Sequence, residues 1–417
     1  MRRTLLLATI LAALAAPGLA TASPYVKYGV QDDAWLEYGT GDDGTVADRA
    51  AQLKQMGVDV VRLTINWRQV EPRRGVYDWS IPDAALKALH AEGIAPLVTL
   101  WGTPRWANGG RSQNWAPKSK WTFAAFAKAA AKRYPYVHLW TIWNEPNQRI
   151  ALRPTSPKTY VQQLLNPAVI AIHNASPRSL VAGGVTAPRA GSGGVSPIDW
   201  IAGMKAAHAR MDAYAHNPYP LRRGETPTSG GCDHCTTVTM ATLPRLLRAV
   251  QKSFGTHMRI WLTEYGYQTN PPDRMLGVTY ATQARYTSDA AQVAYQAPRV
   301  DILIHYLVQD EPNVGRWQSG FYTDTGRVKP ALQAFRFPLA IRSRVRTRTV
   351  LWGQVRPGGR QTYKLLRYDG RHWNAVGGKR RTTARGYFTR TVNAKKGTRY
   401  RIWVPSEHTY SAILTVR

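Results

Sequence analysis

The chain has 417 residues, 44% of them hydrophobic, and a formal net charge of +31 at pH 7. This hydrophobic fraction excludes a disordered chain and allows a sizeable buried core. The length suggests about two domains, although a single barrel domain can also be long.

The first 22 residues have the pattern of a secretory signal peptide. Arg2 and Arg3 precede a short apolar run from Leu5 to Ala16, and the small residues "ATA" end at Ala22. We therefore expect residues 1–22 to be removed on export and the mature protein to be secreted. An N-terminal membrane anchor is the alternative. No other apolar run approaches the roughly 20 residues of a membrane span, so we expect no stable membrane anchor.

Residues 24–338 alternate between strand-like apolar runs and helix-like segments. Several of the runs are continuous and rich in Val, Ile and Leu, as expected of strands buried on both faces. The predicted strands span Tyr25–Val30, Asp59–Ile65, Ala95–Trp101, Val137–Trp143, Ser179–Val185, Asp212–His216, Arg259–Glu264 and Val300–Val308.

This alternation predicts a (β/α)₈ TIM barrel. The clearest helix is "SKWTFAAFAKAAAKRY", with Ser119 as its N-cap and an apolar face at helical spacing. Another, "VADRAAQLKQMG", stops at Gly57. An open doubly wound sheet is the alternative fold. It usually has a glycine-rich phosphate-binding turn near its start, and the sequence has none.

The two cysteines, Cys232 and Cys235, lie in the glycine-rich segment "GGCDHC". In an exported protein, a close pair of this kind favours a local disulfide. Free thiols and a metal site with His234 are the alternatives, but two thiolates and one imidazole do not complete a tetrahedral set. We expect no metal site and no cofactor.

Residues 342–417 have a different texture. Short alternating runs are separated by the turn segments "RPGG", "YDGRH", "VGGK" and "KKG", which predicts a small β-sandwich-like domain. From residue 341 onward, 19 Lys and Arg face two acids, Asp369 and Glu407, a net charge of +17. This charge suggests an anionic cell-wall or polysaccharide surface as partner, with a solubilising face as the alternative. No nucleic-acid motif appears.

Candidate catalytic residues stand where predicted barrel strands end, because barrel active sites form at the C-terminal ends of the strands. Glu145 follows the fourth strand, and Glu264 ends the seventh. Two carboxylates across a barrel mouth can cleave a glycosidic bond. One protonates the leaving oxygen, and the other attacks the anomeric carbon or activates water.

The surrounding motifs resemble those of clan A retaining glycoside hydrolases. The segments "VRLTINW" at the second strand, "WNEPN" after the fourth, "HNPYP" at the sixth and "WLTEYGY" after the seventh look like those of cellulase-type family 5 and xylosidase-type family 39. "LWGTPRWA" is similar to the third-strand segment of the family 39 group. The resemblance covers residues 25–338. It implies a glycosidase that retains anomeric configuration and acts on a β-linked carbohydrate.

The same resemblance implies roles for individual residues. Glu145 would be the acid/base and Glu264 the nucleophile. The remaining predicted contacts with the substrate or with these glutamates are Arg62, Trp101, Asn144, His216, Tyr219 and Tyr306. Enzymes of this clan often carry a tryptophan late on the eighth strand. Here the sequence reads "ILIHYLVQDEP", so His305, Tyr306 or Trp317 would have to replace it. A non-catalytic protein that binds carbohydrate or an anionic wall polymer is the competing hypothesis.

Overall fold

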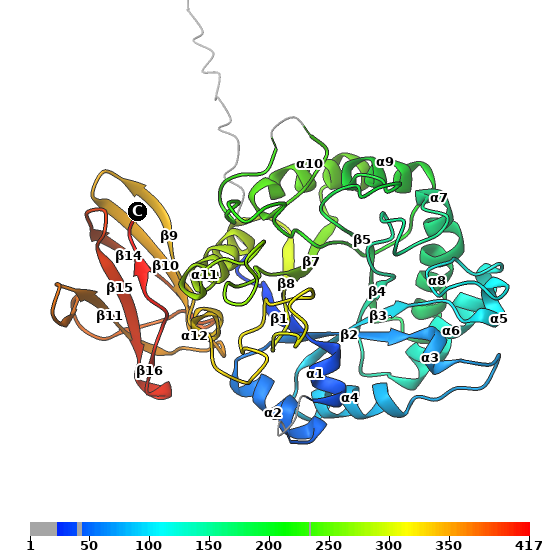
Figure 1. Ribbon diagram of the computed structural model, residues 1–417, viewed down its shortest axis with the longest axis horizontal. Helices are drawn as coiled ribbons and strands as arrows, with labels where there is room; N and C mark the ends of the chain where they lie inside the picture. The colour runs from blue at the N-terminus through cyan, green and yellow to red at the C-terminus, as the bar shows by residue number, and fades with distance from the viewer. Residues whose placement is uncertain (1–22, 40–43, 233–234) are drawn as a thin grey trace, which may run out of the picture.

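The computed structural model describes residues 23–39, 44–232 and 235–417. The predicted signal peptide, residues 1–22, and His234 lie outside the described residues. Figure 1 shows a large α/β body with a smaller β body beside it. Within the described residues, no helix is both long and apolar enough to cross a membrane.

The larger body is a closed parallel barrel in which the eight strands follow chain order, which confirms the predicted fold. The strands are β1 (Lys27–Gln31), β2 (Val60–Asn66), β3 (Ala95–Trp101), β4 (Leu139–Ile142), β5 (Leu180–Thr186), β6 (Ala213–His216), β7 (Arg259–Tyr265) and β8 (Val300–Tyr306). All eight predicted strands are present, with ends that differ by one or two residues in most cases.

Helices surround the barrel and cover the outer faces of the strands. They are α1 (Asp33–Tyr38), α2 (Val46–Gln55), α3 (Trp67–Val70), α4 (Ser80–Ala91), α5 (Arg105–Asn108), α6 (Lys120–Arg133), α7 (Pro157–Thr159), η1 (Tyr160–Leu165), α8 (Asn166–Ala175), α9 (Pro197–Ala206), η2 (Met240–Thr242), α10 (Leu243–Phe254), α11 (Tyr280–Gln296) and α12 (Pro330–Arg336). The predicted N-cap of α6 is confirmed, since the Ser119 side chain accepts from Trp121 N. Gly57 has φ +76°, as a helix stop requires.

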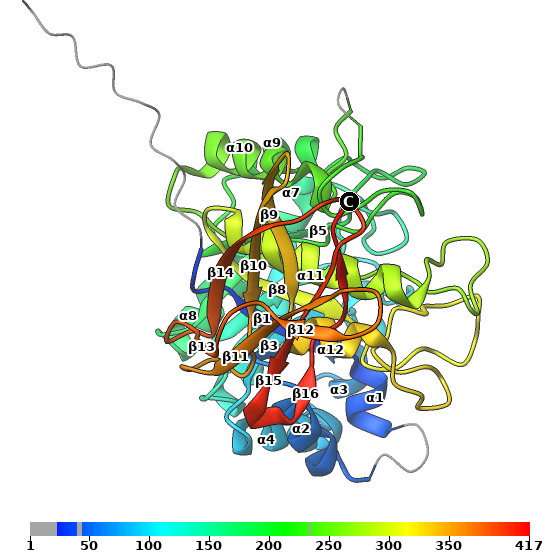
Figure 2. The ribbon, with the colours of Figure 1, turned by 90° about the vertical axis from the view of Figure 1, so that its left-hand side faces the viewer.

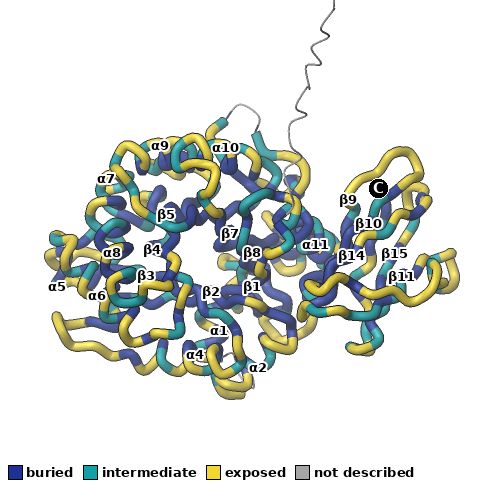
Figure 3. Tube along the Cα trace, turned by 180° about the vertical axis from the view of Figure 1, so that it is seen from behind, coloured by how far each residue is buried: buried dark blue, intermediate teal, exposed yellow. Residues whose placement is uncertain are grey.

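Two layers of apolar side chains hold the barrel together. One lies between the strands and the helices, and the other fills the interior with residues such as Val60, Leu97, Ala182 and Trp261. Figure 3 shows the barrel strands buried while the surrounding loops are exposed. The barrel is therefore a packed support, and its functional groups have to stand at the strand ends.

The smaller body consists of two antiparallel sheets with an apolar core between them, as predicted (Figure 2). Its elements are β9 (Leu339–Val345), β10 (Arg348–Gln354), β11 (Thr362–Tyr368), β12 (Trp373–Ala375), β13 (Arg380–Arg381), β14 (Tyr387–Asn393), β15 (Arg399–Val404), η3 (Pro405–Glu407), β16 (Thr409–Tyr410) and β17 (Leu414–Thr415). The predicted domain start at residue 342 falls inside β9.

The sheet β14-β10-β9 packs on helix α11. The ring of Tyr295 in α11 lies 5.3 Å from the ring of Trp352 and 4.7 Å from that of Tyr387. Arg356 is 2% exposed. Its guanidinium lies 3.6 Å from the ring centroid of Tyr28 in β1, and Nη1 donates to the Phe335 carbonyl over 2.6 Å. The two bodies thus share one buried interface.

Candidate active site

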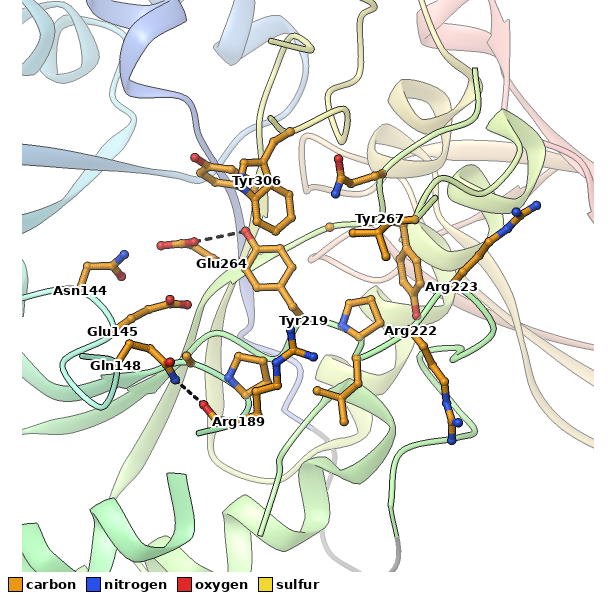
Figure 4. Close-up of a pocket in the computed structure, with 18 of the residues that line it drawn as sticks. Asn144, Glu145, Gln148, Arg189, Tyr219, Arg222, Arg223, Glu264, Tyr267 and Tyr306 are labelled. Atoms are coloured by element: carbon orange, nitrogen blue, oxygen red, sulfur yellow. Dashed lines mark hydrogen bonds between the residues drawn. The ribbon is translucent and has the colours of Figure 1, made fainter. Parts of the chain in front are cut away.

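The strand ends of β4, β6, β7 and β8 surround a cavity of about 550 Å³ (Figure 4). Its lining residues are Asn144, Glu145, Gln148, Ile150, Ala187, Pro188, Arg189, Tyr219, Pro220, Leu221, Arg222, Arg223, Glu264, Gly266, Tyr267, Gln268, Leu276, Tyr306 and Trp317. This volume is typical of small-molecule sites in proteins. The cavity is lined by five of the eight site residues predicted from the sequence: Asn144, Glu145, Tyr219, Glu264 and Tyr306.

Directly after β4, the backbone adopts an unusual conformation that places the Glu145 side chain in the cavity lining. Trp143 and Glu145 both have positive φ, +70° and +45°. Their backbone N–H groups donate to neighbouring strands, Trp143 N to Leu100 O and Glu145 N to Val185 O, each over 2.9 Å. The Trp143 side chain is fully buried, and its indole donates to Ala151 O. Strained backbone of this kind persists where packing fixes it, and it clusters at functional sites.

Glu264 is held as an anchored carboxylate. Oε1 forms an ion pair with Nη1 of Arg62, whose side chain is completely buried. Oε2 accepts a hydrogen bond from the Tyr219 hydroxyl over 3.2 Å (Figure 4). The guanidinium of Arg62 also donates to Gln31 Oε1 and Thr99 Oγ1, over 2.7 and 2.9 Å. Because these partners come from three strands and the loop after β6, the position of Glu264 is fixed by the barrel itself.

Glu145 lies in a different environment. Its Oε1 accepts from Asn217 Nδ2 over 3.1 Å. Burial, followed by the nearby charge of Glu264, raises the pKa of Glu145 from 4.5 to about 7, against smaller lowering effects of Asn217 and Arg62. Near neutral pH, Glu145 can therefore keep its proton. An acid with a raised pKa beside a second carboxyl group is typical of acid–base catalysis.

Asn144 connects the two glutamates. Its Oδ1 accepts from Arg62 Nη2 over 2.9 Å and from Asn217 Nδ2 over 3.4 Å. The carboxamide oxygen is thereby occupied, so the amide N–H group is the part of Asn144 that can meet a ligand hydroxyl. Asn217 was not among the predicted site residues, although it stands in the "HNPYP" motif; its contact with Glu145 depends on strand neighbours.

Aromatic side chains form one wall of the cavity. The Trp317 ring lies 4.8 Å from the Tyr219 ring and 5.4 Å from the Tyr306 ring. Trp317 comes from the loop after β8, and its backbone N–H is held by Glu311 Oε2 over 2.8 Å. Tyr306 and Trp317 are thus in the place where an aromatic substitute was expected. His305 is buried, stacked on Phe321 and bonded to the Ser319 carbonyl.

Three predicted site residues do not line the cavity. Arg62 lies beneath it and acts on Glu264. Trp101 is half-buried and packs against Trp143, with ring centroids 5.9 Å apart. His216 is fully buried; its ring nitrogens meet Thr186 Oγ1 and the Val238 carbonyl over 2.8 and 3.1 Å, and burial lowers its pKa to about 4. His216 therefore supports the loop after β6.

The cysteines lie in that same loop. Both are thiols in the structure, and Cys235 Sγ is 2.7 Å from Thr237 Oγ1. The expected disulfide is not formed here and stays a prediction for oxidising conditions. In the part of the chain that the structure describes, no group of three or more His, Cys, Asp or Glu side chains could hold a metal ion.

Comparison with known proteins supports the fold assignment. A glycoside hydrolase family 42 model, described as beta-galactosidase, matches residues 38–109. This segment contains Arg62 and Trp101 but neither glutamate. No curated protein sequence matches the chain significantly.

Solved structures with the same fold include glycoside hydrolases. A family 39 glycoside hydrolase from Bacteroides cellulosilyticus WH2 has a TM-score of 0.62 and 18% identity, over 91% of this chain and 80% of that one. The GH39 enzyme from Xanthomonas axonopodis pv. citri has a TM-score of 0.55 and 15% identity, over 95% and 94%. GH5_18 from Streptomyces cattleya, solved with GlcNAc, has a TM-score of 0.55 and 17% identity, over 76% and 79%. The resemblance in motifs is thus matched by a resemblance in fold.

Proposed function

We propose that this chain is a secreted retaining glycoside hydrolase that cleaves O-glycosidic bonds of a β-linked oligosaccharide or polysaccharide by double displacement. The main support is the electrostatic difference between two glutamates that line one cavity. Glu264 is anchored by Arg62 and Tyr219, whereas burial and the charge of Glu264 raise the pKa of Glu145 to about 7. A retaining glycosidase needs one carboxyl group that donates a proton and one carboxylate that acts as the nucleophile.

In the proposed reaction, the Glu264 carboxylate attacks the anomeric carbon while Glu145 gives its proton to the leaving oxygen. The ester that forms on Glu264 removes the negative charge that raised the pKa of Glu145. Glu145 then accepts a proton from water, which attacks the ester and releases the sugar with its configuration retained. The amide N–H of Asn144 would bind the sugar 2-hydroxyl during both steps.

The test is hydrolysis of a panel of aryl β-glycosides by the wild type, Glu145→Ala and Glu264→Ala. Both variants should lose at least about 1000-fold in kcat/KM, consistent with loss of a nucleophile or a general acid. Glu92→Gln, at the end of helix α4, is a matched control that should keep wild-type activity. Turnover of no panel member by the wild type would favour the non-catalytic binding hypothesis.

Retention is tested separately by product stereochemistry. The first product seen by proton NMR should be the β anomer, and azide should give an α-glycosyl azide with Glu264→Ala but not with the wild type. A first-formed α anomer would mean inversion, and it would remove Glu264 from the role of nucleophile while leaving hydrolysis intact.

Export is proposed on the leader pattern of residues 1–22. Expression of the full chain in a secreting host should deliver protein to the medium with Ser23 at its N-terminus, as measured by mass spectrometry. Recovery of uncleaved chain in the membrane fraction would instead support the anchor.

The basic C-terminal sheets are proposed to bind an acidic wall polysaccharide. On the outer face of β15, Arg399 stacks on Tyr368 at 4.0 Å, and Arg401 stacks on Tyr410 at 3.7 Å. This face points away from the barrel (Figure 2). Stacked guanidinium groups are pre-ordered to pair with carboxylates.

The fraction of the full chain that co-sediments with an insoluble uronate-rich polysaccharide should decrease steeply as the salt concentration rises from 20 to 500 mM. Arg399→Gln/Arg401→Gln should bind less than the wild type, while the exposed control pair Arg73→Gln/Arg74→Gln should not change. An equal loss of polysaccharide binding in both double variants would indicate that this face is only a general solubilising surface.

A further inference from the structure

The charge of the cavity lining is out of balance. Among the described residues that line it, the acidic side chains are Glu145 and Glu264, whereas Arg189, Arg222 and Arg223 contribute three positive charges. Glu264 is already paired with the buried Arg62. A neutral sugar in this cavity would leave the three arginines without a counter-charge.

The three arginines are exposed, and none takes part in an ion pair within the described residues. An exposed arginine is commonly just a solvated surface group. Here the three come from two separate loops, after β5 and after β6, and all of them line one cavity. Three positive charges in the lining of one cavity are the first indication of an anionic ligand.

The loop that carries Arg222 and Arg223 is built to hold its shape. Glu225 is only 2% exposed, although its side chain is polar. Its carboxylate accepts from Leu221 N over 3.0 Å and from the Thr239 hydroxyl, while its carbonyl accepts from the Tyr267 hydroxyl over 2.6 Å. A buried carboxylate thus fixes the backbone on both sides of the two arginines. A backbone that is already ordered loses less entropy on binding a ligand than a mobile loop does.

The positive charge lies away from the proposed bond cleavage. Figure 4 shows Arg222 and Arg223 on the side of the cavity remote from Asn144 and Glu145, with the Tyr219 and Tyr267 rings between. The negative group of the ligand would therefore not be at the anomeric centre. It would be carried by another part of the same sugar or by a neighbouring sugar, whose ring face can lie on the aromatic side chains.

We propose that the natural ligand of the cavity is an acidic glycan, whose uronate carboxylates or sulfates pair with the exposed guanidinium groups of Arg189, Arg222 and Arg223. Guanidinium groups match both oxyanions with two parallel hydrogen bonds. This substrate class rests on the proposed glycosidase function, and it is independent of the C-terminal face.

The test uses two matched pairs of oligosaccharides. One pair is a set of glucuronate-bearing β-linked xylan fragments and the same set after carboxyl reduction; the other is chondroitin sulfate fragments before and after desulfation. Binding is measured by calorimetry on the full chain with the Glu145→Gln substitution, so that turnover does not interfere. We expect at least one acidic member to bind about tenfold or more tightly than its neutral counterpart, and this preference should shrink between 20 and 200 mM salt.

The variant Arg222→Gln/Arg223→Gln, in the same background, should lose the acidic preference. The exposed pair Arg73 and Arg74, which lies outside both the cavity and the C-terminal sheets, gives a matched control, Arg73→Gln/Arg74→Gln, which should retain it. A preference in the first pair of probes identifies the carboxylate, and one in the second identifies sulfate. The proposal would be overturned if neither pair of probes showed an acidic preference, which includes the case of no binding at all. It would also be overturned if the control variant lost the preference.

The outcomes also separate this inference from the proposed function. Hydrolysis of neutral aryl glycosides without any acidic preference would refute the substrate class and leave the glycosidase standing. An acidic preference abolished in Arg222→Gln/Arg223→Gln, in a protein that cleaves no glycoside, would refute the glycosidase and leave an acidic-glycan site.

Discussion

The raised pKa of Glu145 has a consequence for stability that needs no substrate to measure. Replacing Glu145 with Gln keeps the shape of the side chain but removes its titration. Since the folded protein holds the Glu145 proton up to about pH 7 and an unfolded chain only up to about 4.5, the wild type gains stability from this group below pH 4.5 and loses it as the pH rises toward 7.

The size of the effect follows from the two pKa values. Each pH unit between them corresponds to about 1.36 kcal/mol, so the full gap is at most about 3 kcal/mol. Glu145 is partly open to the cavity, and solvent screening reduces this figure. The stability of Glu145→Gln relative to the wild type should therefore increase by roughly 1–3 kcal/mol from pH 4 to pH 8 and then stay constant.

The assay is urea unfolding of both proteins, followed by tryptophan fluorescence at half-unit pH steps. Asp32, Glu37 and Asp289 also have raised pKa values, at about 7, 8 and 6, but they are common to both proteins and cancel in the difference. In a Glu264→Gln background the rise should be smaller, because the second cause of the raised pKa is gone. A stability difference that does not change with pH would refute the reasoning.

Three further outcomes are expected of the site. Arg62→Leu should reduce kcat/KM by roughly 100-fold or more and the free energy of unfolding by about 3–5 kcal/mol, because it leaves the Glu264 carboxylate buried without its partner; unchanged values in both assays would contradict the ion pair. Tyr219→Phe should reduce kcat/KM by roughly 10- to 100-fold with an unchanged circular dichroism spectrum, as for loss of one hydrogen bond to a charged group. His216→Ala should lower the melting temperature while leaving KM for an aryl glycoside unchanged, and a raised KM would return His216 to the substrate site.

The pH dependence of activity gives a fourth outcome. Because Glu145 must be protonated to act as the acid, kcat/KM should fall about tenfold per pH unit above about pH 7. A profile that stays flat from pH 6 to pH 9 would assign the acid role to another group.

The barrel was predictable because its strands are buried on both faces and therefore stand out as continuous apolar runs. The end of β4 was less so. The predicted strand runs to Trp143, whereas pairing stops at Ile142, because Trp143 and Glu145 adopt positive φ. No local pattern announces that conformation, since it is imposed by hydrogen bonds to β3 and β5.

The glutamates were predictable for a related reason, as strand ends fix where a side chain must stand. The arginines of the cavity could not be predicted from the sequence. Arg222 and Arg223 lie in a long loop without periodicity, and they reach the cavity through contacts of Glu225 with Tyr267 and Thr239. His216 was placed in the site from its motif, yet Thr186 and Val238 take both of its ring nitrogens. Such pairings between neighbouring strands depend on the assembled barrel.

The interface at Arg356 implies that the C-terminal sheets are a structural part of the barrel wall. Cutting the chain near residue 338 would bare the Tyr28 and Tyr295 rings and leave a hollow where the guanidinium stood. The barrel is therefore not expected to fold independently of the C-terminal sheets. Calorimetry of the intact protein should record a single cooperative unfolding transition. Transfer of the C-terminal sheets to a related barrel would also require transfer of the barrel residues that contact Arg356.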